Sequence, residues 1–217
     1  MSGIKKYSNE ISEIYGQGAQ SFSDFFKHAH DFLEYDRSIF VKSMPKGAKI
    51  LDCGCGPGQD SEVFAKLEYH VTGIDITPEF IAMAAKRVPD ANFMQMDMMA
   101  IDLPPASFDG VWVCFSLLHI HQTDVPTVLS NLRDIMKTSG KMMIALHRGP
   151  ETAWVTANIS GLNHNCSVQE WVQSDLEDMI KENGFEIEYS RSFERPGGRF
   201  PLLTIMARLD TANSADI

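Results

Sequence analysis

Long apolar runs are missing from this chain of 217 residues. No stretch approaches the ~20 consecutive apolar residues that a membrane-spanning helix needs. The first residues, MSGIKKYSNEISEIYG, also contain no apolar segment of signal-peptide length. We therefore expect a protein that is neither inserted in a membrane nor secreted.

Clustered positive charge is missing as well, because no run of Lys or Arg is longer than two residues. The chain carries 29 acidic residues against 19 Lys and Arg, which gives a formal net charge of −10. A protein that binds a phosphate backbone needs clustered cations that displace counterions. The composition therefore argues against a nucleic-acid partner and leaves small ligands open.

Cysteine is scarce, with four residues at positions 53, 55, 114 and 166. So few cysteines in a chain of this size do not suggest a disulfide framework, and Cys53 and Cys55 are too close in sequence to bridge comfortably. Their single spacer residue is also shorter than that of a usual zinc knuckle. We expect a reduced, cytoplasmic protein that binds no metal.

Short strands and helices alternate through the centre of the chain. Strands are predicted at 48–53, 69–75, 92–97, 108–115 and 140–147, and helices at 58–67, 77–88 and 123–137. Thr77 should be the N-cap of the second helix, and Gly140 should close the third. This alternation is typical of βαβ units, which build a parallel sheet with right-handed crossovers.

The C-terminal part has a different pattern. Ser167 and Glu170 form a capping-box pattern for a helix at 168–183, which Gly184 closes. Strands at 185–193 and 202–209 then follow with no room for a helix between them, so they should pair antiparallel. The length fits one α/β domain at 46–209, with a helical lid at 1–45 and a disordered tail at 210–217.

A glycine loop joins the first predicted strand to the first helix. Gly54, Gly56 and Gly58 read G-x-G-x-G, whereas a dinucleotide fingerprint reads G-x-G-x-x-G. Asp60 and Glu62 follow in the first turn of the helix, where they suit the helix dipole but would repel a pyrophosphate. The loop therefore favours a ligand that lacks phosphates and carries cationic groups, although it could also be a purely structural turn.

Two acids lie at the ends of the next two strands. Asp75 follows Gly56 by nineteen residues, a position from which a carboxylate accepts hydrogen bonds from both ribose hydroxyls. Asp97 lies among methionines, where an adenine ring could stack with its amino group on the carboxylate. Two alternatives stay open: Asp75 could cap the following helix, and Asp97 could cap a short turn at 98–102.

At this point the chain resembles the class I S-adenosylmethionine-dependent methyltransferases, of the small-molecule type described as methyltransferase type 11 or 25. The resemblance covers roughly residues 45–208, and five motifs carry it in the family's order: LDCGCGPG (51–58), GIDIT (73–77), MDM (96–98), SFDGVWVCFSLLHI (107–120) and GKMMIALH (140–147). It implies a Rossmann-like, doubly wound, seven-stranded sheet whose last strand is antiparallel, and S-adenosylmethionine as the cofactor.

The resemblance also implies roles for individual residues. The cofactor-binding residues would be Asp52, Gly54 and Gly56 at the methionine part, Asp75 at the ribose, Asp97 and Met98 at the adenine, Phe115 beside the methionine end, and also Ile76. One feature departs from enzymes that methylate amino groups of nucleic acids. Those enzymes carry Pro-Pro at the end of the fourth strand, whereas Pro104 and Pro105 precede that strand here.

Histidines are the candidate catalytic residues. His119 follows the fourth predicted strand and His147 ends the fifth, so either could serve as a general base, or both could be structural. The segments outside the sheet, 1–45 and 148–168, should bind the acceptor, and their aromatic residues suggest a small, partly apolar molecule. A protein acceptor, a binding module without catalysis and an NAD-dependent oxidoreductase are the alternatives.

Overall fold

The structure is a computed structural model that describes residues 3–26, 31–159, 162, 164–194 and 201–210. The predicted tail lies outside the described residues except for Asp210, and so does most of the link between the last two strands. In the part of the chain that the structure describes, no helix is long and apolar enough to cross a membrane.

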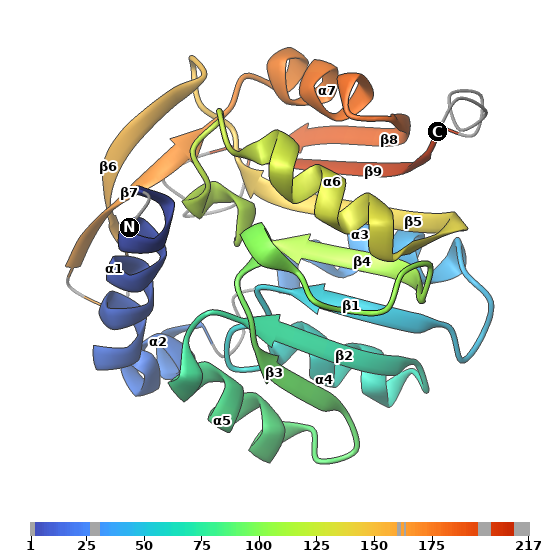
Figure 1. The fold of residues 1–217 in the computed structure, drawn as a ribbon, viewed down its shortest axis with the longest axis horizontal. Helices are drawn as coiled ribbons and strands as arrows, with labels where there is room; N and C mark the ends of the chain where they lie inside the picture. Colours follow the sequence, from blue (N-terminus) through green and yellow to red (C-terminus); the bar gives the residue numbers. More distant parts are fainter. Residues whose placement is uncertain (1–2, 27–30, 160–161, 163, 195–200, 211–217) are drawn as a thin grey trace.

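A seven-stranded sheet forms the centre of the molecule, with the strand order β3-β2-β1-β4-β5-β9-β8 (Figure 1). Its strands are β1 (Lys49–Cys53), β2 (His70–Asp75), β3 (Asn92–Gln95), β4 (Phe108–Cys114), β5 (Met136–His147), β8 (Phe185–Phe193) and β9 (Leu202–Leu209). β9 runs antiparallel to both of its neighbours, and the pairs among β1 to β5 are parallel. The predicted doubly wound sheet with an antiparallel last strand is confirmed.

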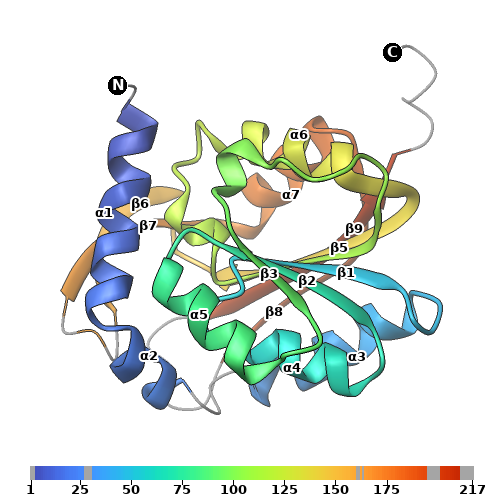
Figure 2. The ribbon, with the colours of Figure 1, turned by 60° about the horizontal axis from the view of Figure 1, so that its bottom comes forward.

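Helices cover both faces of the sheet, as Figure 2 shows. The α-helices are α1 (Gly3–Gln17), α2 (Ala19–Phe25), α3 (Glu34–Lys42), α4 (Gln59–Lys66), α5 (Pro78–Arg87), α6 (Val125–Ile135) and α7 (Gln173–Glu182). The described residues also form three short 3-10 helices: η1 (Asp31–Leu33), η2 (Met98–Ala100) and η3 (Leu117–His119). α6 and α7 lie on one face, and α3, α4 and α5 lie on the other.

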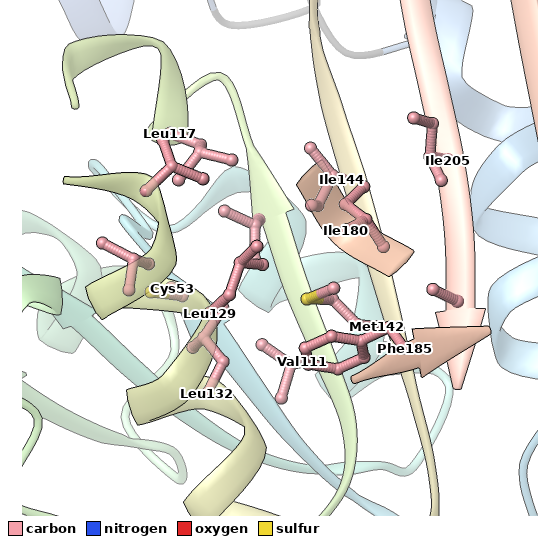
Figure 3. Close-up of a cluster of buried hydrophobic side chains, with 14 of the residues drawn as sticks. Cys53, Val111, Leu117, Leu129, Leu132, Met142, Ile144, Ile180, Phe185 and Ile205 are labelled. Carbon is pink, nitrogen blue, oxygen red and sulfur yellow. The ribbon is translucent and has the colours of Figure 1, made fainter. Parts of the chain in front are cut away.

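The strand β4 shows why the sheet needs both helical layers. Val111 and Val113 pack into the core beneath α6 and α7, part of which Figure 3 shows. Trp112 and Cys114 point to the other side, into the core beneath α3 and α4. Because alternate side chains of a strand face opposite sides, an apolar run without alternation is typical of a strand that is buried on both faces.

The boundary between α6 and β5 differs from the prediction. The helix predicted at 123–137 ends before Met136, which already has extended backbone angles and pairs with Phe108 of β4. The register between β4 and β5 then shifts, so that Gly140 lies in an irregular part of β5 and does not close a helix. A Cβ at Gly140 would lie 2.8 Å from the carbonyl oxygen of Lys137, which favours glycine there.

The capping box predicted for 168–183 is also wrong. Ser167 and Glu170 belong to strand β7 (His164–Glu170), which pairs antiparallel with β6 (Ala153–Ile159) in a separate two-stranded sheet. The helix α7 begins only after this strand and has Val172 at its N-cap. At these residues, cross-strand pairing and the burial of the face that Val168 occupies override the local helix propensity.

In the described part of the chain, the predicted helical lid at 1–45 contains three α-helices and one 3-10 helix. These are α1, α2, η1 and α3, and residues 1–2 and 27–30 lie outside the described residues. α1 and α2 lie beyond the carboxyl ends of the central strands, beside β6 and β7 (Figures 1 and 2). Ile11 and Tyr15 of α1 share a buried cluster with Cys166 and Val168 of β7.

Candidate active site

A pocket opens at the carboxyl ends of β1, β2 and β4, beneath α1 and α2. Its lining combines the glycine loop (54–57 and 59) with residues at and just beyond the ends of β2 (74–77), β3 (96–98) and β4 (114–116, 119 and 120). Phe80 of α5 and five residues of the N-terminal segment complete the described lining: Ser8, Ile11, Tyr15, Phe22 and Phe26. Open α/β sheets bind their ligands at this edge.

The glycine loop can follow its path only because it lacks side chains. Gly54, Gly56 and Gly58 have φ angles of 77°, 51° and 85°, in the left-handed region that favours glycine. A Cβ at Gly54 would lie 2.1 Å from the Cβ of Ser116, so the loop touches the segment after β4. A Cβ at Gly56 would meet no atom within 4 Å, and a side chain there would fill the pocket.

Asp75 ties this loop to the helix that follows β2. Its carboxylate accepts hydrogen bonds from the backbone N–H of Gly56 (2.9 Å, Oδ2) and of Thr77 (2.8 Å, Oδ1). Burial raises the pKa of Asp75, and these backbone hydrogen bonds oppose that rise. Thr77 is the N-cap of α5 as predicted, but its side chain makes no capping hydrogen bond. The Thr77 side chain and the Ile76 backbone N–H also donate to this carboxylate, and they lower its pKa in the same way.

Asp97 lies two residues beyond the end of β3, which stops at Gln95 and not at Asp97 as predicted. Its Oδ1 accepts from the backbone N–H of Met99 (2.9 Å), so Asp97 caps η2, as the alternative interpretation anticipated. Its Oδ2 accepts from the hydroxyl of Ser8 in α1 (2.9 Å). Asp97 and Met98 both line the pocket.

Two of the predicted site residues do not line the pocket. Asp52 is buried below it and accepts a hydrogen bond from the Ser61 hydroxyl (2.6 Å). His147 is half-buried, and its ring centre lies 5.3 Å from that of Phe115, which does line the pocket. The other predicted residues come together in the lining: Gly54, Gly56, Asp75, Ile76, Asp97, Met98, Phe115 and His119.

His119 forms a pair with Tyr15 that the sequence did not reveal. The Tyr15 hydroxyl lies 2.8 Å from Nε2 of His119, and both residues line the pocket. The pKa of His119 is lowered to about 4, mainly by burial and in part by the nearby His147, whereas a hydrogen bond to the Ser167 backbone opposes the shift. At neutral pH the His119 ring is therefore uncharged.

Three polar side chains on one face of α1 contact the segments that line the pocket. Ser8 contacts Asp97 after β3, Ser12 donates to the carbonyl oxygen of Ile76 after β2 (3.2 Å), and Tyr15 contacts His119 after β4. The spacing of four and then three residues is that of one helix face. Sequence periodicity could have placed these side chains on one face, but it could not have named their partners.

The thiols of the cysteines near the pocket are free but unreactive. Cys53, Cys55 and Cys114 are buried and reduced. Burial raises the pKa of each thiol, and nearby carboxylates, Asp52 among them, raise it further. A thiol that stays protonated is a poor nucleophile and a poor metal ligand.

Comparisons with known proteins agree that this chain is similar to methyltransferases. A family model described as "Methyltransferase domain" matches residues 50–140. The Bacillus subtilis protein YqeM, which is named for an inferred methyltransferase activity, is 25% identical over 193 residues, which cover 84% of this chain and 76% of YqeM. The 2-methyl-6-phytyl-1,4-hydroquinone methyltransferase of Synechocystis is 34% identical over 109 residues, but these cover 48% of this chain and about a third of that protein (34%).

A solved structure shares the fold over nearly the whole chain. It is the Burkholderia thailandensis 1,6-didemethyltoxoflavin-N1-methyltransferase with bound 1,6-didemethyltoxoflavin and S-adenosylhomocysteine. The TM-score is 0.79 at 18% identity, and the match covers 96% of this chain and 91% of that one. At this identity the likeness concerns the fold.

Proposed function

We propose that this chain, which belongs to the class I S-adenosylmethionine-dependent methyltransferases, transfers the methyl group to a small, partly apolar acceptor. The observation that carries the proposal is the pocket itself, in which a cofactor loop, two acids and a patch of apolar residues share one cavity. Two of the similar proteins are named for a hydroquinone and for 1,6-didemethyltoxoflavin, and both of these are small molecules.

The residues present fit the cofactor. The open space at Gly56 gives a ligand access to the backbone of the loop. Asp75 and Asp97 put negative charge in the lining, which suits a ligand with an ammonium and a sulfonium group. When bound, S-adenosylmethionine supplies a methyl group that its sulfonium has already activated for in-line displacement. The chain then contributes alignment and exclusion of water.

We assign the parts of the cofactor as follows. Gly54 and Gly56 hold the methionine part, with Phe115 at its end. Asp75 and Ile76 hold the ribose, and Asp97 and Met98 hold the adenine. Asp52 supports the loop from below through Ser61 and does not line the pocket.

Tyr15 and His119 are our candidates for removing the acceptor's proton. In our proposal Nε2 of the neutral His119 ring accepts from the Tyr15 hydroxyl, 2.8 Å away, and the Tyr15 oxygen receives the acceptor's proton. His147 is the weaker candidate, because Phe115 and not His147 lines the pocket.

We further propose that residues 1–45 act as a lid, because α1 contacts the segments after three strands. The four buried, free cysteines support a cytoplasmic location.

A thermal-shift experiment on the full chain tests the cofactor assignment. S-adenosylhomocysteine at a hundred times its Kd should stabilise the fold by about 2.7 kcal/mol, by mass action. For a domain of this size the melting temperature should rise by roughly 5–10 °C. NAD, tested in parallel as a phosphate-bearing control, should give no shift. A shift with NAD and none with S-adenosylhomocysteine would contradict the proposal.

A further inference from the structure

Aromatic rings make up one side of the pocket. Tyr15 of α1, Phe22 of α2, Phe26 at the end of α2 and Phe80 of α5 all line it, and we call these four residues the aromatic wall. The ring centre of Phe22 lies 5.2 Å from that of Tyr15, 4.5 Å from that of Phe26 and 5.3 Å from that of Phe80. Phe22 is therefore the centre of the wall, and it is only partly buried.

Phe115 adds a fifth ring to the lining, from the end of β4. Its φ angle of 51° lies in the left-handed region, which is rare and strained for an aromatic residue. Its backbone N–H donates to the carbonyl oxygen of Ala145 (2.8 Å), and its ring packs beside the rings of Phe32 and His147. Strain of this kind persists where the surroundings fix a residue for function.

The polar features of this part of the pocket are few. The Tyr15–His119 pair brings a hydroxyl and a ring nitrogen to a lining that also contains the aromatic wall, Phe115 and four isoleucines. The hydroxyls of Ser8 and Ser116 in the lining donate to Asp97 and to the Cys53 carbonyl oxygen. Asp75 and Asp97 are the charged residues of the described lining, and they would repel an anionic acceptor. The pocket thus matches an uncharged, apolar body with a single hydrogen-bonding group.

The packing of aromatic rings and the acidity of the acceptor's proton narrow the class of acceptor further. Aromatic side chains gain extra attraction from another ring in an offset or edge-to-face arrangement, beyond the area they bury. A neutral imidazole with a pKa of about 4 is a weak base, so it serves best where the proton is acidic. An aromatic hydroxyl, with a pKa of roughly 10 as in tyrosine, meets that condition far better than an aliphatic alcohol does.

We infer that the acceptor is a flat aromatic compound that is methylated on a ring hydroxyl or a ring N–H. This inference rests on the proposed methyl transfer. The new bond joins the methyl carbon to the aromatic oxygen or nitrogen, the carbon–sulfur bond breaks, and the sulfur keeps its electron pair as a neutral thioether. The acceptor's proton passes to the Tyr15–His119 pair. The aromatic wall and Phe115 hold the ring plane.

Calorimetric titration of the full chain, first saturated with S-adenosylhomocysteine, tests the inference. The probes are 2-naphthol, its saturated counterpart decahydro-2-naphthol, the anion 2-naphthoate, and benzimidazole as a ring N–H compound. We expect 2-naphthol or benzimidazole to bind at least about fivefold more tightly than decahydro-2-naphthol and 2-naphthoate. The tighter of the two identifies the hydroxyl or the ring nitrogen as the acceptor group.

Decahydro-2-naphthol binding as tightly as both aromatic probes would overturn the inference, and so would the tightest binding by 2-naphthoate. Failure of S-adenosylhomocysteine to bind in the first step would instead contradict the proposed function.

Two variants connect the result to the aromatic wall. Phe22→Leu keeps an apolar side chain and should remove most of the preference for the aromatic probe, and Phe26→Leu serves the same purpose if the first variant does not fold. Phe25→Leu is the matched control, because Phe25 belongs to the same helix but is 62% exposed and lies outside the lining. An unchanged preference in a folded Phe22→Leu variant would contradict the role of the wall.

Discussion

At the scale of single residues, Asp75 does more than the sequence suggested. The sequence offered two interpretations of this acid, a ribose ligand or a cap of the next helix. The structure shows that its carboxylate bonds the N–H of Thr77 at the start of α5 and the N–H of Gly56 in the glycine loop. Asp75 therefore holds the loop in place even without a ligand, and a ribose would find a fixed pair of oxygens.

Asp75→Ala should weaken the binding of S-adenosylhomocysteine by roughly 10- to 100-fold. Hydrogen bonds to a charged group are worth ~1.5–3 kcal/mol, and each ~1.4 kcal/mol is a factor of ten in affinity. Titration calorimetry on the folded variant measures the change. Asp90→Ala is the control, because Asp90 is an exposed acid in the turn before β3. Wild-type affinity in Asp75→Ala would mean that the ribose is held elsewhere.

The sequence located the residues whose place depends on one strand end, and it missed those that depend on two distant segments. Asp75 is the last residue of β2 and the glycines directly follow β1, so local patterns were enough. The Tyr15–His119 pair joins residues that are 104 positions apart, and the Ser8–Asp97 pair joins residues that are 89 apart. No local pattern carries that information, because these contacts exist only after α1 packs against the segments at the carboxyl ends of the strands.

At the scale of elements, the contacts of α1 bear on how fast a ligand leaves the pocket. Its contacts from Ser8, Ser12 and Tyr15 have to open before a ligand beneath the helix can leave, if α1 is the lid we propose. Tyr15→Phe removes one hydrogen bond, which is worth about 0.5–1.5 kcal/mol. The dissociation rate of S-adenosylhomocysteine, measured by stopped-flow, should therefore rise by roughly 2- to 10-fold.

Tyr35→Phe is the control for the lid experiment. Tyr35 is 57% exposed, lies in α3 outside the pocket lining, and should leave the rate unchanged. A wild-type dissociation rate in Tyr15→Phe would speak against α1 as a lid.

The helix α3 is attached to the sheet by a buried acid. Asp36 is fully buried and accepts hydrogen bonds from the hydroxyls of Thr204 (2.7 Å) and Tyr189 (3.1 Å). It also forms an ion pair with Arg191 (2.7 Å), which is partly exposed. Removing one partner of such a group leaves the others without their acceptor.

Asp36→Ala should lower the free energy of unfolding by about 3 kcal/mol, the lower end of the range for broken buried pairs, because water reaches Arg191. Urea denaturation measures it. Glu34→Ala, in the same helix but exposed, should cost less than about 1 kcal/mol. Equal losses in the two variants would show that the buried network is not what holds α3.

The two wrong element boundaries share a physical cause. Ser167 and Glu170 have the spacing of a capping box, and Gly140 has the position of a helix terminator, so both local signals favour helix ends. In each case the chain instead pairs with a neighbouring strand, β6 for Ser167 and β4 for the start of β5. Cross-strand partners are distant in sequence, so propensity alone could not weigh them.

At the scale of the whole molecule, His119 makes stability depend on pH. Its pKa in the folded protein, about 4, lies below its ordinary value of 6.5. Between these values the unfolded chain binds more protons than the folded one, so stability rises with pH across this window and is lost as the pH falls from about 6.5 towards 4. At pH 5 the loss from this group should reach about 2 kcal/mol.

Urea unfolding of the wild type and of His119→Gln at pH 7.5 and pH 5 measures that loss. The variant should be less stable at pH 7.5, because it loses the contact with Tyr15, but its further loss at pH 5 should be smaller by about 2 kcal/mol. His70→Gln is the control, because His70 is exposed at the start of β2. The same pH dependence in wild type and His119→Gln would show that His119 is not the group responsible.

The pairing of β9 with β5 and β8 also determines when, during synthesis, the sheet can be completed. Every described residue of the pocket lining lies between positions 8 and 120, so a ribosome makes them all before it reaches β5. β9 is made last of the strands, yet it pairs with both β5 and β8. At about 5–20 residues per second, β5 waits for several seconds with an open edge that could pair with another nascent chain. The binding residues thus exist well before the sheet that supports them is closed.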